Sequence, residues 1–104
     1  MTDWVQDLRE IDPLLFHNTR LLILSLLVAI GPLTQGDLKK KCKITWGALS
    51  AHIKQLEKSL YIEQRQVITF KGPRVLVDVT PKGIKAYSET LYQLRQFIGK
   101  VEGE

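Results

Sequence analysis

The most informative segment of the sequence is TWGALSAHIKQL, residues 45–56. Thr45 is suited to begin a helix, because its hydroxyl group can accept a hydrogen bond from a backbone N–H of the first turn. The apolar side chains that follow recur at the spacing of one helix face: Leu49, Ile53, Leu56 and Leu60. This spacing predicts a helix over residues 45–59 with that face in a hydrophobic core. The opposite face carries small and basic residues, which a helix that only meets water does not require.

A second short helix is predicted immediately before this one. Thr34 and Asp37 form the pattern of a capping box, with Asp in place of the usual Glu, so a helix begins there and ends at residue 41 or 42. Leu38 is expected to face the core, whereas the lysines that follow it face solvent. Two short helices joined by a few residues form a helix-turn-helix, which we expect over residues 34–60.

Two further helices are predicted ahead of this unit. The first is short, ends before a proline and has its apolar residues at helical spacing: Trp4, Leu8 and Ile11. We expect the second to be capped by Asn18, to run through the apolar stretch 21–30 and to end at Gly31. Because that stretch is apolar on nearly every side, it must be covered on more than one face. In so small a protein, a partner subunit is the expected second cover.

The period of the apolar residues changes between residues 61 and 80. Segments 61–69 and 74–79 are rich in β-branched residues, and apolar side chains alternate along the second of them, which predicts a β-hairpin. Its tip is expected at residues 70–73, where a Gly-Pro pair supplies the turn. Two basic residues flank that turn, Lys71 and Arg74.

The C-terminal segment, about residues 81–102, is predicted to be one long helix. Thr80 followed by Pro81 is a helix cap with proline at the first helical position. Apolar residues then repeat at alternating spacings of three and four: Ile84, Tyr87, Leu91, Leu94, Ile98 and Val101. Such a heptad seam indicates lengthwise packing against another helix. We favour a dimer interface formed by this seam together with Trp4 and Leu8; the alternative is that the seam packs on the first two helices of the same chain.

Charge is distributed unevenly along the 104 residues, which are enough for one domain with a single core. The chain has a net charge of +4, yet residues 39–85 contain eleven Lys and Arg against three acids, so the rest of the chain is acidic. A local excess of this size favours a surface that meets a polyanion such as nucleic acid.

Several other classes of protein are not supported. The longest apolar run has ten residues, fewer than the roughly 18 needed to cross a bilayer, so we expect no membrane association. A single cysteine allows no internal disulfide, and the acidic N-terminus does not resemble a secretory signal, which together favour the cytoplasm. No nucleophile-base pair, glycine-rich phosphate loop or metal-ligand spacing is present, so we expect no enzyme, no cofactor and no metal site.

The order of the predicted elements describes a winged helix, and the residues resemble a known family. The matching stretches are DPLLFHNTRLLILSLL at 12–27, LKKKCKITWGALSAHIKQLEKSLYI at 38–62 and VDVTPKGIKAY at 77–87. They resemble winged-helix transcriptional regulators of the MarR-like and ArsR-like groups, and in particular small stand-alone domains of archaea and bacteria. Leu60 departs from the pattern, since the family usually has glycine there.

The resemblance implies a mainly α fold with a β-hairpin wing (α+β), and a homodimer held by N-terminal and long C-terminal helices. It also implies sequence-specific binding of double-stranded DNA, with helix 45–59 in the major groove and the wing, residues 70–74, on the flanking backbone or minor groove. At about 100° per residue, the small and basic residues of helix 45–59 lie opposite its apolar face, which supports this mechanism independently. The expected DNA contacts are Lys39, Lys40, Lys43, Thr45, Gly47, Ser50, Ala51, Lys54, Gln55, Lys58, Lys71 and Arg74.

The remaining conspicuous residues are interpreted as framework. His52 is expected to make a local contact at the edge of the core, His17 a capping or first-turn contact, and Trp46 to pack at the core margin. Cys42 is interpreted as a structural residue; the alternative is a redox switch activated by the nearby lysines. For the whole chain, the alternative to a specific regulator is a winged-helix module that binds DNA without specificity or holds another protein. Whether a small-molecule effector exists does not follow from the sequence.

Overall fold

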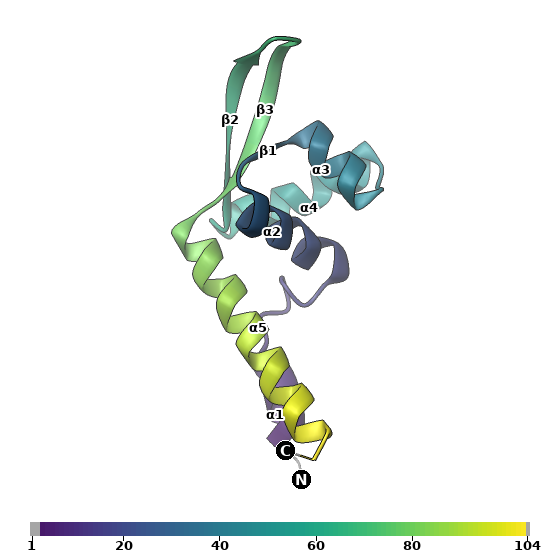
Figure 1. Ribbon diagram of the computed structural model, residues 1–104, viewed down its shortest axis with the longest axis vertical. Helices are drawn as coiled ribbons and strands as arrows, with labels where there is room; N and C mark the ends of the chain where they lie inside the picture. The colour runs from purple at the N-terminus through teal and green to yellow at the C-terminus, as the bar shows by residue number, and fades with distance from the viewer. Residues whose placement is uncertain (1–2, 104) are drawn as a thin grey trace.

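The computed structural model describes the backbone of residues 3–103 and side chains from Val5 onward. Its elements, in chain order, are α1 (Asp3–Glu10), α2 (Asn18–Ile30), β1 (Leu33–Thr34), α3 (Gln35–Cys42), α4 (Trp46–Lys58), β2 (Ile62–Thr69), β3 (Gly72–Val79) and α5 (Pro81–Val101). The molecule measures 55 × 25 × 22 Å. Figure 1 shows a body formed by α2, α3 and α4, with the β2–β3 hairpin projecting from one end and α5 from the other. The predicted winged helix-turn-helix is confirmed.

Threonine side chains begin three of the helices, as the sequence predicts. The Oγ1 atoms of Thr34, Thr45 and Thr80 accept hydrogen bonds from the backbone N–H groups of Asp37, Ala48 and Gly83 at 3.1, 3.1 and 3.0 Å. The cap of α2 differs by one residue from the prediction. His17 is extended (φ −146°, ψ 128°) and its Nδ1 accepts from the N–H of Thr19, whereas Asn18 is already helical. The expectation of a capping contact at His17 is therefore confirmed.

The sheet has three strands in the order β1-β3-β2. Strand β1 is too short to give a period in the sequence; it pairs with β3 through Leu33 opposite Val77. The predicted Gly-Pro turn of the hairpin is wrong: Phe70 and Lys71 form the turn, and Gly72 pairs with Thr69 inside the sheet. Gly72 has a φ of 104°, so glycine is used here to return the chain after the turn rather than in the turn itself.

One continuous core lies between the helices of the body and the sheet. It consists of Leu15, Ile23, Leu24, Leu27, Leu33, Leu38, Leu49, Ile53, Leu56, Ile62 and Val77. The predicted core face of α4 is confirmed except at Leu60, whose side chain is 64% exposed. Helix α4 ends at Lys58, and Leu60 turns the chain towards β2 in a left-handed conformation with a φ of 64°. Leu60 thus adopts the backbone conformation for which glycine is the usual residue.

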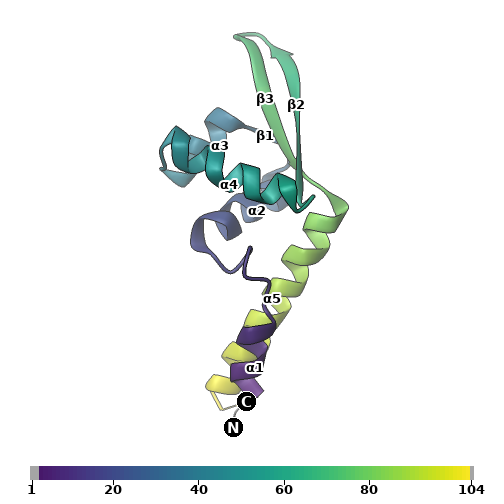
Figure 2. The same cartoon turned by 180° about the vertical axis from the view of Figure 1, so that it is seen from behind.

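Helices α1 and α5 lie side by side and extend away from the body, as Figures 1 and 2 both show. An ion pair of 2.9 Å joins Asp7 to Lys100, and the Gln93 side chain donates to the carbonyl oxygen of Glu10 at 3.2 Å. Near the body, the Tyr87 hydroxyl lies 2.8 Å from Ser25 Oγ on α2. Within the part of the chain that the structure describes, no helix is long and apolar enough to span a membrane.

The predicted seam of α5 is covered only in part by its own chain. Tyr87 and Leu94 are half-buried, as is Leu8 on α1. Apolar side chains remain exposed along α5, at Ile84, Leu91, Ile98 and Val101, and along α2, at Leu22, Val28 and Ile30. The side chain of Trp4, the other residue expected in a dimer interface, lies outside the described residues. The chain itself therefore leaves an apolar surface on both helices.

Candidate nucleic-acid interface

The outer face of α4 carries the residues expected to read DNA. Six of these residues are exposed: Gly47, Ser50, Ala51, Lys54, Gln55 and Lys58. They lie opposite the buried Leu49, Ile53 and Leu56, so the core fixes the rotation of α4 and with it the direction of this face. Thr45 is also exposed, but its Oγ1 is engaged as the cap of the helix. A phosphate at this helix end would therefore meet backbone N–H groups and the positive end of the helix dipole.

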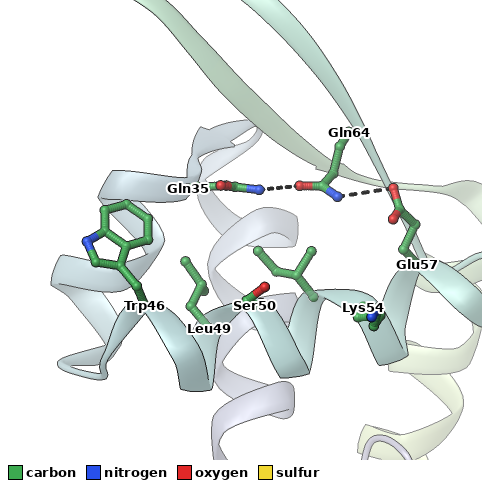
Figure 3. Close-up of a pocket in the computed structure, with 8 residues that line it drawn as sticks. Gln35, Trp46, Leu49, Ser50, Lys54, Glu57 and Gln64 are labelled. Atoms are coloured by element: carbon green, nitrogen blue, oxygen red, sulfur yellow. Dashed lines mark hydrogen bonds between the residues drawn. The ribbon is translucent and has the colours of Figure 1, made fainter.

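A cavity of about 360 Å³ lies between α4 and the wing. Figure 3 shows its floor: the Gln35 side chain donates to Gln64 Oε1 at 2.5 Å, and Gln64 Nε2 donates to Glu57 Oε2 at 3.1 Å. Ser50 and Lys54 lie at its rim. The chain of hydrogen bonds joins α3, β2 and α4, and it therefore links the helix-turn-helix to the wing. Sequence reasoning missed these residues, because Gln35 and Gln64 are 29 positions apart and neither belongs to a recognisable motif.

A second cavity, of about 420 Å³, lies between α3 and the wing tip. Four of the predicted phosphate contacts line it together: Lys39, Lys40, Lys71 and Arg74. They come from two segments about 30 residues apart, and no acidic side chain except Asp37 lies among them. The structure does not bring Lys43 or Lys58 to this cavity; both are exposed elsewhere on the helix-turn-helix.

The sequence-based prediction for Trp46 is wrong. It was expected to pack at the core margin, but it is 56% exposed and lines both of these cavities. The Nζ atom of Lys39 lies 5.5 Å from the centre of its ring, a cation–π contact that leaves much of the indole open. Trp46 therefore lies on the same surface as the candidate DNA contacts and is not a core residue.

His52, by contrast, is half-buried at the edge of the core, as predicted. Its Nδ1 is 3.3 Å from Arg20 Nη1, and its ring centre is 4.8 Å from that of His17. Burial, and then the neighbouring His17 and Arg20, lower the pKa of His52 below its usual value. The expected local contact is confirmed, and the histidine links α4 to the start of α2.

Cys42 is also framework. It is half-buried against the core, and burial raises the pKa of its thiol. The lysines nearby do not reverse this effect, so the structure favours the structural interpretation over a reactive thiolate. Among the described residues, no group of three or more His, Cys, Asp or Glu side chains could hold a metal ion.

Comparison with known proteins places these features in a family. Residues 19–98 match the family described as winged helix DNA-binding domain. An uncharacterized protein of Methanocaldococcus jannaschii is 28% identical over 83 residues, which cover 80% of this chain and 90% of that protein. The solved structure of a transcriptional regulator homologue from Pyrococcus horikoshii OT3 is similar with a TM-score of 0.85 at 26% identity, covering 92% of this chain and 97% of that one. A transcriptional regulator of Thermotoga maritima has a TM-score of 0.67 at 19% identity, covering 96% and 66%, and shows the fold alone.

Proposed function

We propose a specific role for this chain, which belongs to the family of winged helix DNA-binding domains. In this role it binds defined sequences of double-stranded DNA as a homodimer and regulates transcription. The resemblance to winged-helix regulators of the MarR-like type holds at the level of family and fold. The observation that carries the proposal is the exposed face of α4, which bears small and basic residues and adjoins the basic cavity beside the wing.

In the proposed complex, α4 enters the major groove. Gly47 and Ala51 allow a close approach of the helix, and the methyl group of Ala51 suits contact with a thymine methyl group. Ser50 and Lys54 have donors within reach of base edges, which is the kind of contact that distinguishes sequences. Both side chains lie at the rim of the cavity between α4 and the wing. The remaining cations position the protein on phosphates.

The proposed homodimer uses the apolar surface that the chain leaves open. On α5, Leu91 and Ile98 are exposed one above the other, two turns apart, and α2 adds Val28 and Ile30. Exposed apolar patches of this kind mark interaction sites in soluble proteins. A second copy supplies the same seam, as a two-fold interface requires. Replacing Leu91 by Glu is therefore expected to convert a dimer into a monomer in sedimentation equilibrium, while Glu89→Gln, on the exposed face of the same helix, leaves the dimer intact.

Selection of bound duplexes from random DNA tests the proposal as a whole. We expect an enriched inverted repeat whose half-site centres lie about 10 bp apart or a multiple of that spacing. Affinity for the selected duplex should fall steeply with salt, because phosphate contacts release counterions. Tight binding without an enriched sequence would favour the alternative, a non-specific DNA-coating module. Absence of DNA binding would reject both.

A further inference from the structure

The end of the wing carries an apolar cluster that the fold does not use. Phe70, in the turn, is fully exposed (107% of the reference area), and Ile68 is 84% exposed. Pro73 pairs with Ile68 across the two strands and is exposed as well. We call Ile68, Phe70 and Pro73 the wing-tip cluster. Single exposed apolar residues are ordinary on a protein surface, but three together at the end of a projecting hairpin are not.

The turn does not need the Phe70 side chain. Thr69 Oγ1 accepts from the N–H of Lys71 at 3.2 Å and donates to the carbonyl oxygen of Gly72 at 2.6 Å. These bonds, with the φ of 104° at Gly72, define the turn by backbone and threonine groups alone. The phenyl ring is therefore exposed to water in the free protein. Its apolar surface stays available for burial in a complex.

The charges around the cluster identify the kind of partner. Residues 64–77, the outer part of the hairpin, contain three cations, Arg65, Lys71 and Arg74, and no carboxylate. The acidic residues of the hairpin, Glu63 and Asp78, face each other at its base, next to the body. The apolar end is thus surrounded by positive charge only, which complements an anionic surface.

The position of the tip favours DNA over other anionic surfaces. Lys71 and Arg74 line the same cavity as Lys39, Lys40 and Trp46, so the tip lies on the side of the molecule that presents the helix-turn-helix. Phe70 lies six positions after Gln64, whose side chain bonds to Glu57 of α4. At about 3.3 Å per residue, the tip reaches roughly 20 Å beyond that point. This reach spans the backbone that separates a major groove from the neighbouring minor groove.

We infer that the wing-tip cluster is an apolar wedge that enters the minor groove next to the recognition site and opens a base step there, with Phe70 as the inserted side chain. The inference rests on the proposed function and deepens it. Proteins that kink DNA from the minor groove insert Phe, Leu, Ile, Met or Pro between bases, and the cluster consists of three of these types. Lys71 and Arg74 hold the phosphates on either side. Flexible pyrimidine–purine steps are opened at the lowest cost, so the wedge selects sequence outside the positions that α4 reads.

The test compares Phe70→Ala, Phe70→Leu and Lys71→Ala with the unaltered protein on the duplex obtained by selection. DNA bending is measured by fluorescence resonance energy transfer between the duplex ends, and unstacking by 2-aminopurine placed at each flanking step in turn. We expect the unaltered protein to bend the duplex and to raise 2-aminopurine fluorescence at one step per half-site. Phe70→Ala should lose both signals and bind about tenfold more weakly, with an unchanged salt dependence, while Phe70→Leu retains most of the bend.

Lys71→Ala is the matched control at the neighbouring position. It removes a phosphate contact but no apolar surface, so it should lower the salt slope by about 0.9 per site and keep the bend. Equal bending and equal affinity of Phe70→Ala and the unaltered protein would overturn the wedge while leaving the proposed function intact. If the unaltered protein bound no DNA, both the wedge and the proposed function would be rejected. Phe70-dependent binding to vesicles with anionic lipid, with no effect on DNA, would assign the tip to a membrane and also reject the wedge.

Discussion

Gly83, in the first turn of α5, lies directly against the carbonyl group of Tyr61, the residue that leads into the wing. A β-carbon at position 83 would lie 2.8 Å from Val79 Cγ2 and closer still to the Tyr61 oxygen. Backbone cannot give way as a side chain can, so only glycine allows the end of the wing and the start of the C-terminal helix to approach this closely.

Gly83→Ala is therefore expected to destabilise the fold by about 3 kcal/mol, the upper range for overpacking a core position. The measurement is urea-induced unfolding followed by circular dichroism. Gly36→Ala is the matched control: it is also helical, and its added carbon would have nothing nearer than 3.9 Å. It should gain up to about 1 kcal/mol from helix propensity. Equal stability of the two variants would contradict the close approach.

Leu60→Gly is expected to stabilise the protein. Leu60 has a φ of 64°, a conformation that costs a non-glycine residue about 1 kcal/mol. Because its side chain is exposed, it buries little apolar surface that could offset this cost. We expect a gain of about 0.5–1 kcal/mol in the free energy of unfolding. Leu60→Ala keeps the β-carbon and should give none of this gain, so a stabilised alanine variant would show that the backbone is not the cause.

Tyr61→Phe removes a hydrogen bond between distant segments. The Tyr61 hydroxyl donates to Asp12 Oδ2 at 2.5 Å, joining the wing entrance to the segment before α2. We expect the free energy of unfolding to fall by about 1.5–3 kcal/mol, as for hydrogen bonds to charged groups. Tyr92→Phe on the exposed face of α5 should change stability by less than about 0.5 kcal/mol.

The same tyrosine predicts a loss of stability in alkali. Burial, and then the hydrogen bond and charge of Asp12, raise the pKa of Tyr61 from 10.0 to about 12. Because the folded state holds this proton more tightly, the stabilisation is complete below pH 10 and is lost as the pH rises towards 12. The free energy of unfolding of the unaltered protein should fall across this pH range, and this fall should be absent in Tyr61→Phe.

His52 predicts a separate dependence on the acid side. Its pKa is lowered by burial and by His17 and Arg20, so the unfolded chain binds this proton more readily than the folded one. Stability should be greatest above the usual pKa of 6.5 and should fall as the pH drops below it towards the lowered value. His52→Gln, which can still accept from Arg20, is expected to remove this part of the pH dependence. An unchanged profile between pH 7 and 5 would contradict the assignment.

Lys54→Ala and Lys71→Ala are expected to affect DNA binding differently. Lys54 lies on the outer face of α4, where its loss should relax the sequence preference at one position and cost about 1–3 kcal/mol. Lys71 is a proposed phosphate contact, so its loss should weaken binding to all duplexes alike. Competition between selected and scrambled duplexes measures the difference. If Lys54→Ala lowered the affinity for both duplexes equally, Lys54 would not be a residue that contacts bases.

Most of the local structure could be predicted from the sequence. The three threonine caps and the core face of Leu49, Ile53 and Leu56 depend on spacings of three or four residues, which a helix turns directly into contacts. The same holds for the outer face of α4, since the direction of the core fixes the opposite direction as well. These predictions needed no knowledge of neighbouring elements.

Two of the errors occur where separate segments meet. Trp46 is exposed at the start of α4, where it borders the wing and contacts Lys39 of α3. No spacing in the sequence gives the distance between the wing and α4. The turn at Phe70 and Lys71 depends on which residues of β2 and β3 pair, and register is decided along the whole hairpin. Neither arrangement produces a periodic pattern in the amino-acid sequence.

A helix-turn-helix followed by a hairpin and a long helix could be predicted from the amino-acid pattern, as could the outward face of α4, because short-range periodicity and capping are local properties. The shared cavity of the α3 lysines and the wing-tip cations beside Trp46, and the full exposure of Phe70, became evident only from the three-dimensional arrangement. The arrangement of wing and body depends on contacts between residues far apart in the sequence, such as the Gln35–Gln64 hydrogen bond and the close approach of Gly83 to the backbone carbonyl group of Tyr61.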